Sequence, residues 1–365
     1  MGLKNRIKKL AEMTVDKYRH NAKLKNEIRK FNDPRRVSIY SRIELTPLQM
    51  QQIDDVYIKH YGRRIPYTWH RHYTAFTGNF DPLYFPELLY IPEFEHYLNS
   101  KKDYIRVIAD KNILSMIANG VGIKTPKTII SCANGILRDD NYHMIQWSQV
   151  ESTIGDETYF AKPTVDSDSG KGCILINKSD GHLADSLKGL GKDFVVQERI
   201  KCSNSIRKVY PDSVNTFRLI TYIWNGKVNC APIIMRIGRN GSFLDNAHAG
   251  GIFIAVDNDG TLHRKAFTEF KDEFDAHPDT GLVFEGHRIE NVPKVIESAI
   301  KMHSAIPQLG VVNWDFTINE DEDPVLIEAN TSGGSIWLIQ MAWGCGVFKE
   351  NTISILEWLK CRNAK

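Results

Sequence analysis

The chain has 365 residues, of which 42% are hydrophobic and 25% charged, a composition typical of a globular protein rather than a disordered one. No apolar run is long enough to span a bilayer, no apolar signal stretch follows the basic N-terminus, and six scattered cysteines without a CxxC pair favour free thiols in a reducing cytoplasm. Residues 1–36 hold 12 Lys and Arg against 4 Asp and Glu, whereas the remainder holds 35 against 40, which argues against a nucleic-acid-binding body.

Residues 3–31 have the periodicity of an amphipathic helix with a basic face. The apolar positions that fall roughly on one side are Leu3, Ile7, Leu10, Tyr18, Ile28 and Phe31. Two interpretations stay open. The helix either docks on the protein's own body, or meets an anionic membrane surface or an acidic glycan.

A second helix is predicted over residues 46–61, with Thr46 as its N-cap and Pro47 at its first position. The following segment, residues 62–99, combines many aromatic residues with prolines, arginines and histidines. Stacking rings beside cations could bind sugars and acidic groups, so this segment is either a recognition surface or a loop-rich module packed against the main domain.

From residue 108 onward, helices alternate with strands. The segment that begins at Asp110 reads as a helix that stops at Gly120 or Gly122, and a strand follows Pro126. Two hairpins are predicted, one turning at Asn225-Gly226 and one near Asn258–Gly260. Amphipathic helices are expected over residues 292–306 and 351–362.

Between the strands "TYFAK" and "GCILI" lies the loop "PTVDSDSGKG", which is rich in small residues. Such a loop can fold over a polyphosphate with its backbone N–H groups, and Lys162 and Lys171 would add positive charge there. The loop is not a Walker A motif, because GxxxxGK[ST] followed by a helix is absent. By itself, a plain hairpin is the commoner explanation of such a loop.

Near the C-terminus, "VVNWDFTI" and "PVLIEAN" flank the turn "NEDEDP", which predicts an antiparallel hairpin. Pairing brings Asp315 near Glu328, and Asn330 shares the face of Glu328 because strand residues alternate sides. Two carboxylates and an amide oxygen repel each other unless a cation lies between them, and hard oxygen ligands in small number suit Mg²⁺. A solvated hairpin face explains the acids of the turn, but not acids set between Trp314 and Phe316.

These motifs, in this order over roughly residues 106–345, resemble the ATP-grasp superfamily. The resemblance is carried by "DKNILSMIANGVGIKTP", "YFAKP", "VVQERI", "NTFRLITY", "IIMRIGRNGSFLDNAHAGG" and "NWDFTI…IEANTSGG". Asp followed by Glu thirteen residues on, and Asn two further, is the most specific spacing. "SVNTFRLITY", "AHAGGIFIAVD" and "IEANTSGGS" look like the sugar-transfer-associated branch, which is linked to surface polysaccharide (capsule) synthesis.

The resemblance implies an α+β fold of two subdomains that clamp ATP, preceded by an N-terminal helical, aromatic-rich module. The expected divisions are residues 1–105 for that module, 106–192 for the subdomain with the phosphate lid, and 193–365 for the subdomain with the adenine hinge and metal site. The implied ATP contacts are Lys111, Lys162, Ser167, Ser169, Gly170, Lys171, Gly172, Gln197, Glu198, Arg199 and Ile200. The implied ligands of Mg²⁺, or of Mn²⁺ in its place, are Asp315, Glu328 and Asn330.

The implied reaction is ATP-dependent amide formation through an acyl phosphate, with a small-molecule or glycan carboxylate and an amine as partners. The residues expected to act on the substrates are Arg218, Arg236, Asn246 and His248. His248 is a candidate base, although a lone histidine is more often a substrate or structural contact. The chain departs from D-alanine ligases at Asn313, where they carry arginine, so Arg218 or Arg236 must meet the transition-state charge.

Two further function classes remain open beside the ligase. One is a phosphotransferase that stops at transfer to a hydroxyl, and the other is a nucleotide-binding module without chemistry in a glycan-assembly complex. The metal triad and both lysines argue against the latter. The expected location is the cytoplasm, with the basic helix as a possible peripheral membrane contact, and the sequence sets neither the two substrates nor the oligomeric state.

Overall fold

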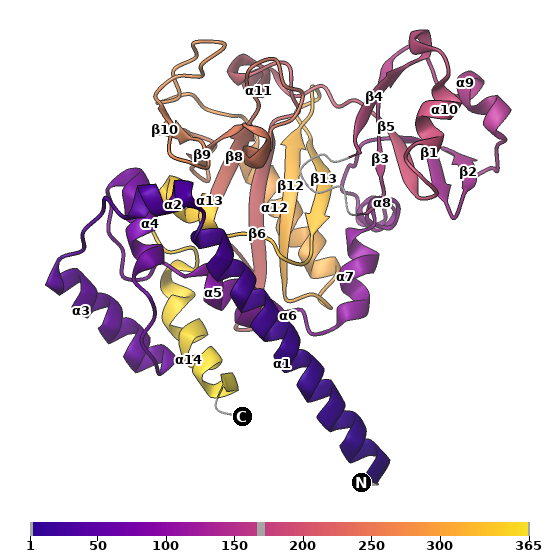
Figure 1. Ribbon diagram of the computed structural model, residues 1–365. Helices are drawn as coiled ribbons and strands as arrows, with labels where there is room; N and C mark the ends of the chain where they lie inside the picture. Colours follow the sequence, from indigo (N-terminus) through magenta and orange to yellow (C-terminus); the bar gives the residue numbers. More distant parts are fainter. Residues whose placement is uncertain (1–2, 166–171, 364–365) are drawn as a thin grey trace. The chain divides into compact units, whose positions relative to one another are not determined.

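The computed structural model describes residues 3–165 and 172–363 and divides into two compact units (Figure 1). Unit 1 comprises residues 1–100, 270–272 and 332–365, and unit 2 comprises residues 101–269 and 273–331. The chain therefore enters unit 1, leaves it for unit 2, and returns at its C-terminal end. The sequence-based subdomain boundaries at residues 105 and 192 stay predictions, because the two units separate unit 1 from unit 2 and do not divide unit 2 further.

Unit 1 is helical, as expected for the N-terminal module. Thr46 caps the third helix through a reciprocal capping box with Gln49, and Pro47 occupies the first position, as predicted. The long basic helix is present over residues 3–31. The helices are α1 (Leu3–Phe31), α2 (Pro34–Tyr40), α3 (Pro47–Val56), α4 (Thr68–Thr77), α5 (Glu87–Leu89), α6 (His96–Leu98), α13 (Trp337–Trp343) and α14 (Thr352–Asn363), with π-helical turns at Tyr57–Tyr61 and Tyr90–Glu95.

The aromatic segment forms the core of unit 1. Phe85 and Phe94 are fully buried, and both pack on Phe348 with ring centroids 4.9 and 4.7 Å apart. Tyr73, Tyr84 and Tyr90 are likewise at 0% exposure. The expectation of a sugar-stacking surface is therefore wrong for these rings, because the returning C-terminal helices cover them. The expectation of a loop-rich segment is also wrong, since α4, α5 and the second π-helical turn occupy much of it.

Two buried glutamates of unit 1 hold the segment that follows the predicted metal hairpin. The carboxylate of Glu95 accepts the N–H of Gly333 at 2.8 and 2.9 Å. Glu87 accepts the N–H groups of Ile336 and Trp337, each at 2.9 Å. Burial raises the pKa of Glu87 to about 8 and that of Glu95 to about 7, although their hydrogen-bond donors oppose the shift.

Unit 2 holds the strands. Its helices are α7 (Lys102–Ala109), α8 (Lys111–Gly120), α9 (Val150–Thr153), α10 (Leu183–Lys188), α11 (Asn204–Val209) and α12 (Val292–Ala305). Its strands are β1 (Thr128–Ala133), β2 (Ile136–Asp139), β3 (Thr158–Pro163), β4 (Ile174–Asn177), β5 (Phe194–Glu198), β6 (Thr216–Trp224), β7 (Lys227–Cys230), β8 (Ile233–Ile237), β9 (Ile252–Val256), β10 (Leu262–Phe267), β11 (Glu273–Phe274), β12 (Val311–Ile318) and β13 (Pro324–Asn330).

Within the described residues these strands form two antiparallel sheets. The smaller sheet has the order β2-β1-β5-β3-β4, and the larger one β11-β10-β9-β8-β6-β12-β13, with β7 pairing β6 (Figure 1). The hairpin turn predicted at Asn225-Gly226 is confirmed, with φ of 51° and 76°, the left-handed geometry that an Asn-Gly turn supplies. The β9–β10 hairpin is confirmed too, and Gly260 is required in its turn because a Cβ would lie 2.0 Å from the Ile289 carbonyl oxygen.

Each sheet has its own apolar core. Helix α12 contacts β6, β7, β12 and β13, and its buried Val295, Ala299 and Met302 belong to the larger core. The smaller core unites Ile130, Val196 and Ala161 on one sheet face with Leu183 and Leu187 of α10. Alternation along each strand then places Ser131, Val195 and Lys162 on the opposite face of the smaller sheet.

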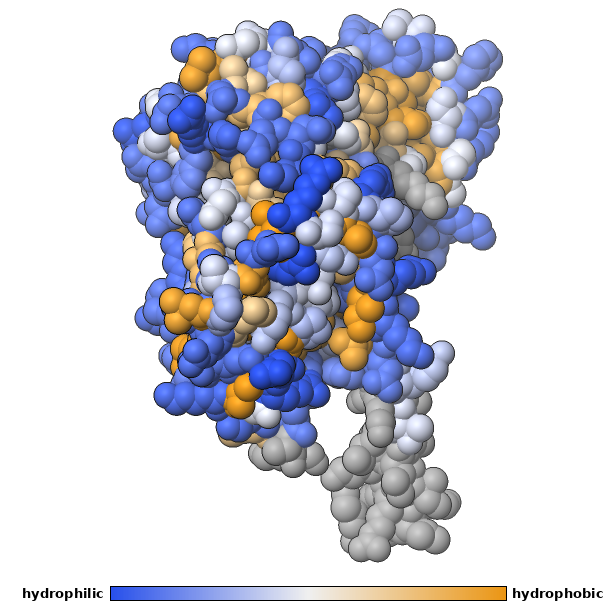
Figure 2. All heavy atoms as spheres, turned by 60° about the vertical axis from the view of Figure 1, so that its left-hand side comes forward, coloured by the Kyte–Doolittle hydropathy of each residue, from blue (hydrophilic) through white to orange (hydrophobic). Residues whose placement is uncertain are grey.

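Hydrophilic side chains predominate on the face drawn in Figure 2, with the apolar ones in scattered groups. Among the helices that the structure describes, none combines the length and the apolar character needed to cross a membrane.

Candidate functional site

The predicted hairpin of Asp315, Glu328 and Asn330 is present as β12 and β13 of the larger sheet. Asp315 lies directly opposite Glu328, and Asn313 directly opposite Asn330. Asp315 is 3% exposed, whereas the Glu328 side chain is 31% exposed. The Asn330 Nδ2 atom lies 3.4 Å from Asp315 Oδ2. The structure thus brings the three predicted metal ligands together on one face.

Two arginines converge on the buried Asp315 carboxylate. Arg218 on β6, the strand neighbouring β12, donates from Nε and Nη2 to the two oxygens at 2.5 and 3.1 Å. Arg236 on β8 places Nη2 3.0 Å from Oδ2. Burial acts to raise the pKa of Asp315, but the two guanidinium groups outweigh it and hold that pKa below its usual value. Both arginines that the motifs singled out therefore belong to one charge cluster.

Arg236 is held by partners that the sequence analysis missed. The Thr216 hydroxyl accepts from its Nε and Nη2 at 3.1 and 2.7 Å, and Asp245 Oδ2 lies 3.7 Å from Nε. Burial raises the pKa of Asp245, with Arg236 and Thr216 opposing the rise. A signal existed for both residues: Thr216 shares a strand face with Arg218, and Asp245 directly precedes Asn246 in the motif.

Lys111 lies at the start of α8, where Asp110 caps the helix by accepting the N–H groups of Asn112 and Ile113. Its ammonium group is 3.2 Å from Glu328 Oε1 and 3.5 Å from the Thr164 carbonyl oxygen, and the side chain is only 4% exposed. The first predicted phosphate lysine and the second predicted metal carboxylate are thus an ion pair here, and each could instead meet a ligand of opposite charge.

Lys162 on β3 is also buried, at 5% exposure. Burial lowers its pKa to about 8, the nearby Lys111 charge adds to that effect, and Glu328 opposes it. Two lysines in one buried region cost free energy unless an anion neutralises them. Together with Arg218 and Arg236 they face three carboxylates, those of Asp245, Asp315 and Glu328, so the cluster carries an excess of one positive charge.

The strand proposed to read adenine is β5. Gln197 is buried, and its Nε2 donates to the Thr128 hydroxyl at 3.2 Å and approaches the Pro126 carbonyl oxygen at 3.5 Å. Glu198 Oε1 accepts the Lys127 N–H at 3.0 Å, so its side chain ties β5 to the chain leading into β1. Arg199 donates to the Asp212 carbonyl oxygen at 2.9 Å and is exposed, and Ile200 is half-buried.

Four of the predicted lid residues, Ser167, Ser169, Gly170 and Lys171, lie outside the described residues. Gly172, at the end of that loop, is described and adopts a φ of +72°. The next residue, Cys173, is half-buried, and burial raises the pKa of its thiol, which does not favour a nucleophilic thiolate.

Asn246 and His248 have local partners. The Asn246 side chain caps the short 3₁₀ helix Ala247–Ala249 by accepting the His248 N–H at 2.8 Å. The His248 ring exposes about half of its surface, and its Nδ1 lies 2.5 Å from Oε2 of Glu269, a carboxylate that is 5% exposed. A histidine oriented by a buried carboxylate is an arrangement suited to proton transfer. No motif or residue spacing pointed to Glu269.

The oxygen donors on the β12–β13 face suit a hard cation. No cluster of three or more His, Cys, Asp or Glu in the described part of the chain could hold a metal. The donor set here is different: two carboxylates, the Asn330 amide, and the buried Oδ1 of Asn313, which has no hydrogen-bond partner in the described structure. Mg²⁺ is bound in this way, by one or two carboxylates with phosphate and water oxygens completing the shell. The residues present therefore fit Mg²⁺.

Comparison with solved structures finds matches at low sequence identity. D-alanyl-alanine synthetase A from Vibrio cholerae matches with a TM-score of 0.43 and 13% identity over 70% of this chain and 64% of that one. VanG D-Ala:D-Ser ligase from Enterococcus faecalis matches with a TM-score of 0.42 and 14% identity over 72% of this chain and 63% of that one. N5-carboxyaminoimidazole synthase from Aspergillus clavatus, in complex with ADP and 5-aminoimidazole ribonucleotide, matches with a TM-score of 0.39 and 12% identity over 64% of this chain and 47% of that one.

The chain spans about half the length of several solved structures that it matches, including N5-carboxyaminoimidazole synthase. No curated protein sequence matches it. The model of one protein family, described as sugar-transfer associated ATP-grasp, matches residues 91–354, which include every predicted site residue. The chain belongs to the sugar-transfer associated ATP-grasp family.

Proposed function

We propose that the protein is an ATP-dependent, ADP-forming carboxylate–amine ligase that works in the cytoplasm on an acidic sugar or precursor of a cell-surface polysaccharide. The observation that carries the proposal is the paired cluster on β12 and β13, in which Asp315 meets two arginines and Glu328 meets Lys111. Such a cluster can hold polyphosphate, a divalent cation and an attacking carboxylate side by side. Its place in an ATP-grasp chain supports nucleotide use.

In this proposal Lys111 and Lys162 neutralise the phosphates of ATP. Both side chains are buried, so binding an anion relieves the repulsion between them. Gln197 and the backbone groups of Glu198–Ile200 meet the adenine ring at the end of β5. Ser167, Ser169, Gly170, Lys171 and Gly172 form the lid over the phosphates.

Mg²⁺, or Mn²⁺ in its place, is assigned to Asp315, Glu328 and Asn330. When bound there, the cation would place positive charge beside the phosphates of ATP and stabilise the negative charge that develops during transfer. Glu328 is the more accessible carboxylate, and its partner Lys111 can turn to phosphate instead. Asp315 also pairs with Arg218 and Arg236 and so orients the two guanidinium groups.

Arg218 and Arg236 bind the substrate carboxylate and align it with the γ-phosphate. A carboxylate oxygen attacks the γ-phosphorus, and the bond between that phosphorus and the oxygen bridging it to the β-phosphate breaks. ADP departs, and the substrate becomes an acyl phosphate. The amine nitrogen then attacks the acyl carbon, inorganic phosphate departs, and the nitrogen loses a proton. The arginines also stabilise the oxyanion of that second step. With Nδ1–H directed to Glu269, His248 can take the amine proton at Nε2, and Asn246 holds the histidine segment.

The substrate class rests on the family description, which associates these chains with sugar transfer. An acidic sugar supplies the carboxylate that the arginines require. The basic helix α1 would face an acidic glycan or an anionic membrane surface, since its sequence carries the positive charge of the chain.

The test is a screen for ADP release with uronic acids, nucleotide sugars and amino acids, each paired with amines, followed by mass spectrometry of the product. If the protein is a ligase, ADP release should need both substrates. The product mass should equal the sum of the masses of the acid and the amine, less one water. ADP release with a phosphorylated hydroxyl product, and no need for an amine, would replace this proposal with a phosphotransferase.

A further inference from the structure

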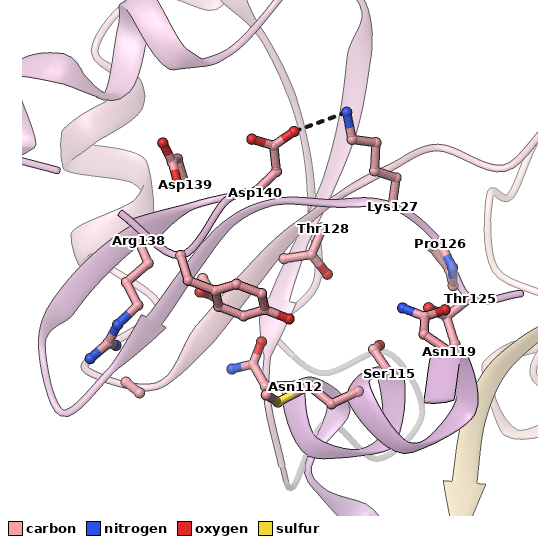
Figure 3. A pocket seen from close by; sticks show the side chains of 14 residues that line it. Asn112, Ser115, Asn119, Thr125, Pro126, Lys127, Thr128, Arg138, Asp139 and Asp140 are labelled. Atoms are coloured by element: carbon pink, nitrogen blue, oxygen red, sulfur yellow. Dashed lines mark ion pairs between the residues drawn. The ribbon is translucent and has the colours of Figure 1, made fainter. Parts of the chain in front are cut away.

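A cavity of about 570 Å³ lies in unit 2 between helix α8 and the β1–β2 hairpin (Figure 3). Figure 3 shows Asn112, Ser115 and Asn119 on the helix side and Arg138 and Asp139 on the hairpin side. The volume is that of a small-molecule site. None of the residues assigned above to ATP, metal or substrates lines it. The lining residues are Asn112, Ser115, Met116, Asn119, Thr125, Pro126, Lys127, Thr128, Ser131, Ala133, Arg138, Asp139, Asp140 and Tyr142.

Three of the four charged residues in the lining already have partners. Lys127 Nζ pairs with Asp140 Oδ2 at 3.0 Å, as the dashed line in Figure 3 marks. Asp139 Oδ1 accepts the N–H groups of Asn141 and His143 at 2.9 and 2.8 Å. The Arg138 guanidinium is different, because it has no carboxylate partner and no hydrogen bond among residues 3–165 and 172–363. The lining charges therefore sum to zero, and Arg138 is the charged group among them left to pair with a ligand.

The remaining lining combines neutral polar groups with an accessible ring. The amides of Asn112 and Asn119 and the hydroxyl of Ser131 have no side-chain hydrogen bond within the described structure. Tyr142 and Met116 expose 62% and 52% of their surface. Amides and hydroxyls pair with hydroxyl groups of a ligand, while an exposed tyrosine ring offers a flat apolar surface to the C–H face of a ring.

We propose that this cavity binds a small polyhydroxylated anion, of the size of one sugar acid. Its carboxylate would pair with Arg138, its hydroxyl groups with Asn112, Asn119 and Ser131, and its ring would pack on Tyr142. A bidentate guanidinium–carboxylate pair supplies most of the discrimination against an uncharged sugar. The proposal concerns binding alone and stands without the ligase assignment.

The cavity is separate from the proposed phosphate site but shares its supports. Register pairs place Lys162, Val195, Ser131 and Arg138 in one row across β3, β5, β1 and β2, so Arg138 lies three strands from Lys162, or about 14 Å at the usual strand spacing. A carboxylate held by Arg138 is thus at the far side of the sheet from Lys162.

Two contacts link the cavity to the nucleotide residues. Thr128, in the cavity wall, accepts the hydrogen bond from Gln197, and Ser115 donates to the carbonyl oxygen of Lys111 at 2.8 Å. A ligand in the cavity could therefore shift Gln197 and Lys111, which are proposed to hold adenine and phosphate. By reciprocity, a ligand that changes ATP affinity must have its own affinity changed by ATP to the same extent.

Direct binding to the full chain, without turnover, tests the proposal. D-glucuronate, D-glucose and inorganic phosphate are the probes, titrated by saturation-transfer NMR and calorimetry. We expect glucuronate to bind at least about tenfold more tightly than glucose, and Arg138→Gln to weaken glucuronate by at least about tenfold, the scale of one lost charged hydrogen bond. Tyr142→Asn, which suits the left-handed φ of 64° at that position, should weaken glucuronate severalfold.

Arg264→Gln is the matched control, because Arg264 is an exposed arginine on β10 outside the cavity, and it should leave glucuronate binding unchanged. ATP affinity without glucuronate should be the same in Arg138→Gln as in the wild type. Glucuronate binding that is unaltered in Arg138→Gln overturns the proposal. So does phosphate binding as tight as glucuronate with the same dependence on Arg138, or a loss of ATP binding in that variant, which would make the cavity a nucleotide site. A failed ligase screen leaves all these readouts intact.

Discussion

Arg218 and Asp315 face each other across neighbouring strands and are joined by two hydrogen bonds, from Nε and Nη2 of the guanidinium to the two carboxylate oxygens. The pair is largely buried, with side-chain exposures of 14% and 4%. Arg236 adds a second guanidinium to the same carboxylate. Asp315 is thus a buried carboxylate shared by two arginines. Its register partner Glu328 pairs with one lysine and is more exposed.

This difference predicts unequal costs for the same chemical change. Asp315→Asn leaves two buried guanidinium groups without their shared anion, so it should lower the free energy of unfolding by about 3–5 kcal/mol. Glu328→Gln should cost less, because Glu328 is about one-third exposed to water. Urea unfolding monitored by circular dichroism compares the two. Equal losses would argue against a central role of Asp315 in this charge cluster.

Glu328→Gln should nevertheless remove most turnover while the fold is kept. The substitution takes one negative ligand from the proposed cation, so activity should recover in part as Mg²⁺ concentration is raised. Glu320→Gln, in the exposed turn of the same hairpin, is the control and should behave as the wild type. Full activity of Glu328→Gln at ordinary Mg²⁺ concentrations would be incompatible with the metal assignment.

Lys162→Ala should weaken ATP binding by about 1–3 kcal/mol, the range of a lost charged hydrogen bond. Calorimetry with ATP measures the change directly. Lys178→Ala, an exposed lysine beyond β4, is the matched control. An unchanged affinity in Lys162→Ala would remove this residue from the phosphate site.

The lowered pKa of Lys162, about 8, adds a pH dependence to the same measurement. Below that pKa the ammonium is charged and binds phosphate; as the pH rises through 8 the free protein loses the proton that binding needs. ATP affinity should therefore fall by up to about tenfold per pH unit above 8, and this fall should be absent in Lys162→Ala.

The contact between His248 and Glu269 predicts coupled kinetic effects once a substrate pair is known. His248→Asn should lower kcat by about 10²–10⁴ with little change in KM for ATP, because a proton acceptor is lost. Glu269→Gln should lower kcat less, and the double variant should be no worse than His248→Asn, since Glu269 acts through the histidine. Additive losses would indicate that Glu269 serves the fold rather than the histidine.

In unit 1, the raised pKa of Glu87 predicts that the free energy of unfolding falls as pH rises. Its folded pKa of about 8 exceeds the 4.5 of an ordinary glutamate, so the folded state holds the extra proton between these values. The contribution is full below about pH 4.5 and is lost as pH increases to about 8, at up to about 1.4 kcal/mol per pH unit. Glu87→Gln mimics the neutral acid and should reduce the fall of the melting temperature between pH 6 and 8, leaving the part that comes from Glu95, whose pKa is about 7. The exposed Glu350→Gln should leave the wild-type slope unchanged.

The hairpin that carries Asp315 and Glu328 could be predicted from the sequence, because its turn, its alternation and its acids all lie within twenty residues. The pairing of Asp315 with Arg218 could not, since alternation gives the face of a strand but not its neighbours in the sheet. For the same reason Asp245 and Glu269 were missed: each reaches its partner through a loop or a strand end whose path has no periodic signal. The rings near Tyr84 and Phe85 were open to two interpretations because their cover, around Phe348, is more than 250 residues away.

That distance along the chain has a consequence for synthesis on the ribosome. Phe85 and Phe94 are made early, but the ring of Phe348 on which both pack is made almost last. Until then the nascent chain must carry an uncovered aromatic surface while the strands of unit 2 emerge and pair. A chain that ends before residue 332 would keep that surface exposed permanently, so premature termination should yield aggregates or chaperone-bound protein rather than a shortened, folded protein.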